Sequence, residues 1–119
     1  MQEMQDSIEV MTSSKGAIIE ANGQIYPLKE GVNIVGRKTM FPMDIDKIEI
    51  DDRTISRYHC KILLKTLPNG TQKAVLTPYQ NNINRICVDG NYLSNVDAVY
   101  LFDGSQIQLG KTVATFRFL

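Results

Sequence analysis

The chain is punctuated by four dipeptides in which Asn or Asp precedes Gly. They are Asn22-Gly23, Asn69-Gly70, Asp89-Gly90 and Asp103-Gly104. Asn, Asp and Gly adopt the positive φ angles of tight hairpin turns more readily than other residues. Because short apolar runs separate these turn signals, the sequence predicts many short strands with tight turns between them.

Between the turn signals, apolar and polar residues alternate with the two-residue period of a β-strand. The alternation is clear over residues 47–50, 106–109 and 113–118, and each segment predicts a strand with one buried face. Shorter apolar runs predict further, well-buried strands at 18–19, 25–26, 32–35, 60–64 and 74–76. No segment carries a helical i, i+3, i+4, i+7 stripe beyond one turn. We therefore predict an all-β fold, a sandwich or barrel of antiparallel strands.

Length and charge limit the number of domains and the class of partner. A chain of 119 residues with 43% hydrophobic content can bury one sizeable core. We expect a flexible polar tail over residues 1–14 and one domain over residues 15–119. The formal net charge is zero, so no global field attracts nucleic acid or an anionic membrane. No apolar run approaches the roughly 20 residues that span a bilayer. We therefore expect neither nucleic acid nor membrane as a direct partner.

The two cysteines bear on the cellular compartment. The first residues lack the basic start and apolar block of a secretory signal, so an intracellular protein is expected. Cys60 and Cys87 are then reduced core thiols. The alternative is a disulfide of the kind that joins the sheets of secreted sandwiches, although the chain has no Trp to pack on it.

Cationic and hydroxyl side chains occur in polar segments at the ends of predicted strands. Arg37 follows Gly36 at the end of one strand, and Ser56 and Arg57 lie in the polar loop before another. Two guanidinium groups and a hydroxyl, brought from separate loops, are suited to bind a doubly charged oxyanion such as a phosphate. A further polar loop covers residues 80–85. Sandwiches gather their irregular loops at one end, so we expect these loops to share one face.

The same residues argue against catalysis. Ser56 and His59 lie three residues apart at the entry to a strand, and no nucleophile elbow or oxyanion glycine cluster accompanies them. His59 is the only histidine, and with two distant cysteines it does not make a zinc site. A lone histidine among apolar neighbours is typical of the core. We predict no catalytic residues, no metal and no cofactor.

Five pieces of sequence, in order, resemble the forkhead-associated (FHA) domain. They are Val35-Gly36-Arg37, Ile55-Ser56-Arg57-Tyr58-His59, Asn84 in its loop, Val88-Asp89-Gly90 with Leu93, and Asp103 to Gly110, which is similar to the pattern D-G-D-x-I-x-x-G. The resemblance runs from about Lys15 to Leu119. Within the family, the chain looks most like the N-terminal FHA domain of the mediator of DNA damage checkpoint group, and specifically like an insect mutator-type member.

The resemblance implies an eleven-stranded sandwich that binds phosphothreonine peptides through loops at one end. Carried over by position, Arg37 and Ser56 contact the phosphate and Arg57 assists them. Asn84 hydrogen-bonds the peptide backbone. The resemblance gives two further residues a loop-structuring role. Gly36 allows a close turn, and His59 holds the loop over 51–57 that carries Ser56, the serine loop, from below.

The loop around the asparagine departs from the family pattern. Ile83, Arg85 and Ile86 stand where the family has a small or hydroxyl residue, a glycine and a threonine. The lost hydroxyl removes a hydrogen bond to an anion, and Arg85 offers a bidentate donor in exchange. We therefore expect a phosphothreonine-type pocket that is only partly retained.

By resemblance, the expected role is a non-catalytic interaction module of a nuclear scaffold in the DNA damage response. It would recruit a phosphorylated or unphosphorylated protein partner. The alternative is a degenerate FHA domain that acts mainly through homodimerisation, which is also a property of the mediator group. The apolar stretches 40–43 and 96–102 are candidates for such an interface.

Overall fold

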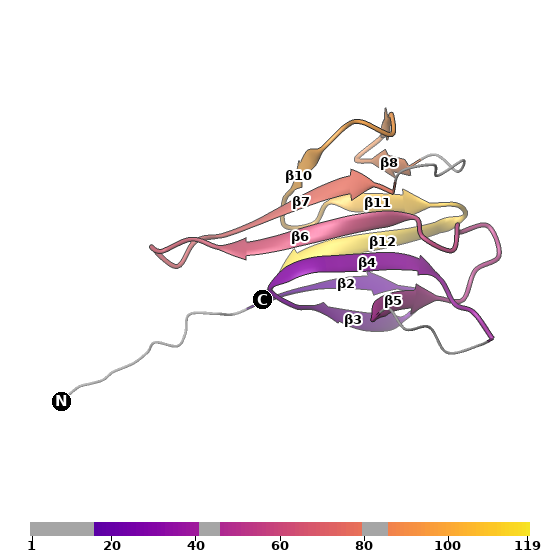
Figure 1. The fold of residues 1–119 in the computed structure, drawn as a ribbon, viewed down its shortest axis with the longest axis horizontal. Helices are drawn as coiled ribbons and strands as arrows, with labels where there is room; N and C mark the ends of the chain where they lie inside the picture. Colours follow the sequence, from indigo (N-terminus) through magenta and orange to yellow (C-terminus); the bar gives the residue numbers. More distant parts are fainter. Residues whose placement is uncertain (1–15, 41–45, 80–85) are drawn as a thin grey trace.

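The computed structural model describes residues 16–40, 46–79 and 86–119, which form two β-sheets packed face to face (Figure 1). The five-stranded sheet has the order β10 (Val99–Leu101), β7 (Gln72–Pro78), β6 (Cys60–Thr66), β4 (Gly31–Arg37) and β5 (Lys47–Ile50). The six-stranded sheet has the order β3 (Gln24–Leu28), β2 (Ala17–Ala21), β12 (Thr112–Phe118), β11 (Gln106–Leu109), β8 (Ile86–Val88) and β9 (Asn91–Leu93). The predicted all-β sandwich is confirmed, and the tail predicted over residues 1–14 lies outside the described residues.

Two of the turn dipeptides occupy the tight hairpins that they predict, whereas Asp103-Gly104 connects β10 to β11, which belong to different sheets. Asn22 and Gly23 both have positive φ, 53° and 77°, in the two-residue turn between β2 and β3. Asp89 and Gly90 do the same between β8 and β9, with φ of 50° and 86°. Positive φ at both central positions is the geometry that matches the twist of paired strands. These two turns therefore fix the register of their hairpins.

The core lies between the two sheets. Its largest fully buried side chains include Phe116 and Ile19 from the six-stranded sheet and Ile62 and Leu76 from the five-stranded sheet. Ile55, from the loop after β5, is also fully buried and joins this cluster. β6, β11 and β12 contribute alternate residues to the core, as the two-residue period requires, whereas β8 is buried along its whole length.

The prediction that 32–35 and 60–64 are well buried throughout is wrong. Val32 is 52% exposed and Leu63 is 40% exposed, because both belong to the solvent face of the five-stranded sheet. The predicted burial also fails at Ile25, which is 60% exposed on β3. β9 and β10 were not predicted, since three residues are too few to show a period. Both cysteines are buried free thiols, as predicted, and not a disulfide.

One strand pair is parallel and brings the functional loops together. β4 pairs with β5 in parallel and with β6 antiparallel, so the loop over 51–59 begins and ends beside the C-terminal end of β4. β7 also ends at this end of the sheet, where Pro78 pairs with Cys60. In Figure 1 this is the right-hand end of the sandwich, opposite the C-terminus. The described part of the chain has no helix of the length and hydropathy needed to cross a bilayer.

Candidate functional site

Gly36 and Arg37 form the end of β4, where the chain passes very close to the serine loop. The amide of Arg37 donates a hydrogen bond to the carbonyl oxygen of Ser56 at 2.9 Å. A Cβ on Gly36 would lie 1.8 Å from the carbonyl oxygen of Arg57, far inside van der Waals contact. Only glycine permits this approach, so the two segments that carry the arginines are joined through their backbones.

His59 lies under the serine loop with no exposed surface. Its Nδ1 accepts a hydrogen bond from the amide of Ser56 at 2.9 Å, so this nitrogen carries no proton. The backbone amide of His59 donates to the carbonyl of Val35 at 2.9 Å. The histidine therefore links the loop to β4, and its buried position does not offer it to a substrate.

Lys47, on β5, is a site residue that the sequence analysis did not identify. Its side chain is only 1% exposed, and its ammonium group donates to the carbonyl oxygens of Arg37 and Arg57 at 3.0 and 2.8 Å. The ammonium also lies 4.9 Å from the centroid of the Tyr58 ring and 3.9 Å from a carboxylate oxygen of Glu49. One buried cation thus holds both arginine-bearing segments.

The surroundings of Lys47 disfavour its charge. Burial is the main cause that lowers the pKa of the Lys47 ammonium below its ordinary value, and Glu49 opposes this effect. The guanidinium groups of Arg57 and Arg37 lower the pKa further. Three cations therefore act on one another at this end of the sandwich, where an anion would relieve their repulsion.

The structure brings together only part of the predicted site. Arg37 and Ser56 are half-buried and Arg57 is exposed at the same end of the sandwich. The predicted residues Asn84 and Arg85 lie outside the described residues. Tyr79, just before that segment, donates its amide to the carbonyl of His59 at 3.0 Å. The connection from β7 to β8 therefore starts beside the serine loop.

The first half of the loop over 51–59 is held by Asp52. Its carboxylate accepts hydrogen bonds from the amide and hydroxyl of Thr54 at 2.8 and 2.7 Å, and from the hydroxyl of Thr112 on β12. These hydrogen bonds lower the pKa of Asp52, and the bond from Thr112 has the largest effect. A Cβ on Gly110 would lie 2.3 Å from the Thr54 hydroxyl oxygen, so the hairpin between β11 and β12 also approaches closely.

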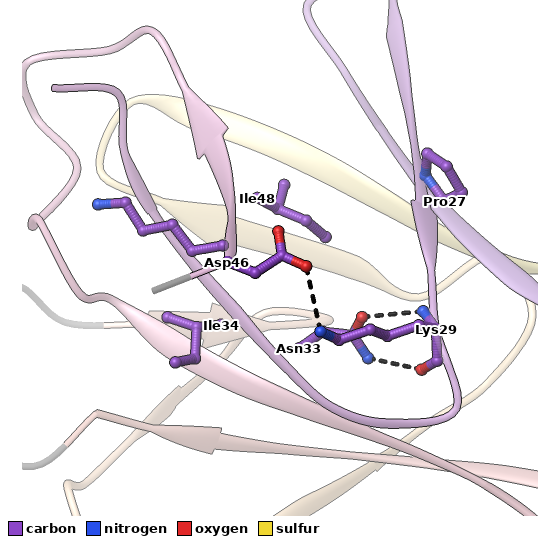
Figure 2. Close-up of a pocket in the computed structure, with 7 residues that line it drawn as sticks. Pro27, Lys29, Asn33, Ile34, Asp46 and Ile48 are labelled. Atoms are coloured by element: carbon purple, nitrogen blue, oxygen red, sulfur yellow. Dashed lines mark hydrogen bonds and ion pairs between the residues drawn. The ribbon is translucent and has the colours of Figure 1, made fainter. Parts of the chain in front are cut away.

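A small cavity of about 100 Å³ lies beside β4 and β5 (Figure 2). Asn33 forms part of its wall and uses its side chain internally, since its amide nitrogen donates to the backbone oxygens of Lys29 and Ile62 at 2.9 and 3.1 Å. Figure 2 also shows the pair between the Lys29 ammonium and Asp46, at 3.2 Å. These polar groups bond to one another or to the backbone of the protein.

Comparison with known proteins identifies the family. The sequence matches the FHA domain over residues 33–110. The chain belongs to the FHA family. FHA domains are protein interaction modules that bind phosphothreonine and are generally not enzymes. Within residues 16–40, 46–79 and 86–119, no cluster of three or more potential metal ligands occurs.

Solved FHA structures share the fold. The FhaA FHA domain, solved with the intracellular domain of a second protein, is 25% identical with a TM-score of 0.67, covering 85% of this chain and 99% of that chain. The MEK1 FHA domain in complex with a phosphothreonine peptide of HOP1 is 20% identical with a TM-score of 0.70, covering 87% and 96%. An FHA domain from Arabidopsis thaliana is 23% identical with a TM-score of 0.69, covering 88% and 86%. No protein of curated function matches the chain.

Proposed function

We propose that this FHA domain binds phosphothreonine peptides through the end of the sandwich that carries Arg37, Ser56 and Arg57. The observation that carries the proposal is the buried Lys47, whose ammonium holds the carbonyls of both arginines. A buried cation held between two guanidinium-bearing segments creates a fixed, positively charged end. Such a site is suited to a phosphate, which carries nearly two negative charges at neutral pH.

In this proposal, the loop over residues 80–85 supplies the rest of the pocket. Asn84 hydrogen-bonds the backbone of the bound peptide, and Arg85 replaces the lost hydroxyl with a charged donor. A missing hydrogen bond to an anion costs about 1.5–3 kcal/mol, or one to two decades of affinity. Binding weaker than in an FHA domain with the full pattern is therefore expected unless Arg85 contacts the phosphate.

The wider role that we propose is recruitment of partners to a nuclear scaffold of the DNA damage response. Its support is the sequence resemblance to the mediator of DNA damage checkpoint group around Pro27-Leu28 and Val35-Gly36-Arg37. In that setting, phosphorylation of a partner controls recruitment, because the unphosphorylated threonine offers no charge to Arg37.

Titration of a phosphothreonine peptide library, paired with the same peptides unphosphorylated, tests the proposal. We expect selective binding of phosphorylated peptides by the wild-type domain and loss of that selectivity in Arg37→Ala. Arg117→Ala is the matched control, since Arg117 forms an exposed pair with Glu20 on the six-stranded sheet. Equal and negligible binding of both peptide sets across the library would refute phosphothreonine recognition.

Homodimerisation is a second candidate function, favoured by large apolar side chains that face solvent. Met40, Val96 and Phe102 are 93%, 92% and 69% exposed, whereas Phe41 to Met43 lie outside the described residues. Light scattering at tens of micromolar should then give twice the 13.4 kDa mass of the chain. A monomer at every concentration contradicts this second function.

A further inference from the structure

The solvent face of the five-stranded sheet carries a row of apolar side chains that crosses four strands. Val32 of β4 pairs with Leu63 of β6, which pairs with Val75 of β7, and Val75 pairs with Tyr100 of β10. Val32, Leu63 and Tyr100 are 52%, 40% and 58% exposed. Paired residues of neighbouring strands lie about 5 Å apart, so the row is continuous and not a scatter of single exposed residues.

Lysines border this row on both sides. Lys65 of β6 lies directly opposite Lys73 of β7, and Lys61 lies two residues before Leu63 on the same face. Like charges directly opposite one another destabilise a sheet. Among the described residues, no carboxylate forms an ion pair with any of the three lysines. We call Lys61, Leu63, Lys65, Lys73, Val75 and Tyr100 the basic face.

An apolar cleft adjoins the basic face at the edge of the sheet. It has a volume of about 240 Å³, and its lining includes Lys73, Tyr100, Leu101, Phe102 and Phe118. Phe102 is 69% exposed, and the Lys73 ammonium lies 5.5 Å from the centroid of the Tyr100 ring. A cleft with aromatic walls and a lysine at its rim suits an apolar side chain that has an acidic neighbour.

The N-terminal segment of the chain has that composition. Residues 1–14 contain Glu3, Asp6 and Glu9 and no Lys or Arg, and their apolar residues are Met1, Met4, Ile8, Val10 and Met11. All thirteen Lys and Arg residues lie at or after Lys15. The neutral chain is thus an acidic segment joined to a domain with a positive surplus.

The segment also joins the domain beside the cleft. Phe118, which lines the cleft, pairs with Ala17, the first residue of β2. The amide of Leu119 donates to the carbonyl of Gly16 at 3.0 Å. In Figure 1 the C-terminus and the start of β2 lie together at the end of the sandwich away from the Arg37 loops.

We propose that the acidic segment Glu3–Met11 docks on the basic face and the apolar cleft of its own chain. The five residues from Met11 to Gly16 reach up to about 17 Å when extended, and the row from Tyr100 to Val32 crosses three strand spacings, about 14 Å. The carboxylates then lie against the lysines, and an apolar side chain enters the cleft between Tyr100 and Phe118. The docking does not depend on phosphate binding, because the cleft, Lys65 and Lys73 lie toward the end of the sandwich away from Arg37 and Ser56.

A spin label on Ser7→Cys of the full chain, with amide signals followed by NMR, tests the proposal. Cys60 and Cys87 are buried, so the new thiol is the one that reacts. We expect the label to broaden the amide signals of Lys73, Tyr100 and Phe102 beyond detection. Lys65→Glu combined with Lys73→Glu should abolish the broadening, and adding Glu3→Lys, Asp6→Lys and Glu9→Lys should restore it.

The matched control is Lys111→Glu, which makes the same charge change at an exposed position in the turn between β11 and β12 and should leave the broadening intact. Uniform weak broadening over the surface would overturn the proposal. A second sample mixes isotope-labelled chain that has no spin label with spin-labelled chain that has no isotope. Broadening in this mixture would also overturn the proposal, because the occupant would then be another copy of the chain. Mutual rescue of the two charge reversals within one chain is the supporting result.

Discussion

Replacing Lys47 by methionine removes the buried cation and keeps most of its length and volume. The carbonyl oxygens of Arg37 and Arg57 then lose a charged donor that lies 3.0 and 2.8 Å away. A buried acceptor left unsatisfied costs about 1–3 kcal/mol. Two opposing effects reduce the loss, since water reaches the exposed Arg57 and the variant no longer desolvates an ammonium group beside two guanidiniums.

The balance predicts that Lys47→Met lowers the free energy of unfolding by about 2 kcal/mol at neutral pH. For a domain of this size, that corresponds to a fall of roughly 6–10 °C in the midpoint of thermal unfolding. Chemical denaturation gives the free energy directly. The control is Lys29→Met, since Lys29 forms an exposed pair with Asp46 that is worth about 0–1 kcal/mol.

The difference in stability between wild type and Lys47→Met should also depend on pH. Because the folded-state pKa of Lys47 is lowered, the unfolded chain binds more protons between that pKa and the ordinary value of 10.5. The free energy of unfolding of the wild type therefore gains a contribution as pH rises through this window, and the variant lacks it. A variant as stable as wild type, with no change in this difference between pH 7 and 10.5, would refute the assigned role of Lys47.

Three further predictions follow from the close approaches and pKa shifts of this end of the sandwich and its core. Gly36→Ala should lower the free energy of unfolding by about 3 kcal/mol, because its Cβ meets the Arg57 carbonyl, whereas Gly23→Ala, with open space around it, should cost about 1 kcal/mol in a denaturation experiment. Asp52→Asn should cost about 1–2 kcal/mol at pH 7. Because the folded-state pKa of Asp52 is lowered, its carboxylate stabilises the fold above the unfolded pKa of 3.8. This stabilisation, and with it the cost of Asp52→Asn, should disappear as the pH falls from 3.8 through the lower folded-state pKa. A cost that stays constant down to about pH 2 counts against the hydrogen bond from Thr112. Burial raises the pKa of Cys60 to about 12, so the stability of the wild type relative to Cys60→Ala should fall by about 1.4 kcal/mol per pH unit between pH 9.0 and about 12 in chemical denaturation, and a constant difference contradicts the burial of the thiol.

Sequence patterns predict most of the strands because their causes are local. Asn22-Gly23 and Asp89-Gly90 specify turns through backbone sterics alone, and the alternation over 106–109 and 113–118 requires only one buried face. The positions of Arg37 and Ser56 at strand ends follow from the same patterns. β10 escapes them because its three residues are too few to show a period.

Lys47 shows why part of the site could not be predicted. In the sequence it alternates with Ile48 and Ile50 and has the pattern of an ordinary solvated lysine. Its burial arises because β5 pairs with β4 in parallel, which directs the ammonium toward carbonyls ten residues away on both sides. Local periodicity contains no information about a parallel neighbour, so only the tertiary arrangement reveals the residue.

The solvent face of the five-stranded sheet presents the opposite case. An apolar run such as 60–64 predicts burial, and the structure places Leu63 and Val32 on an exposed face instead. A strand with one buried face needs apolar residues only at every second position. A run such as 60–64 therefore has more apolar residues than the core takes up. Here the additional apolar residues lie in register across neighbouring strands. They adjoin Lys65 and Lys73, which lie directly opposite each other, and such a pair of like charges destabilises a sheet. The mismatch between pattern and burial therefore supports the docking surface proposed for the N-terminal segment, as the cationic cluster at Lys47 supports the proposed phosphothreonine site.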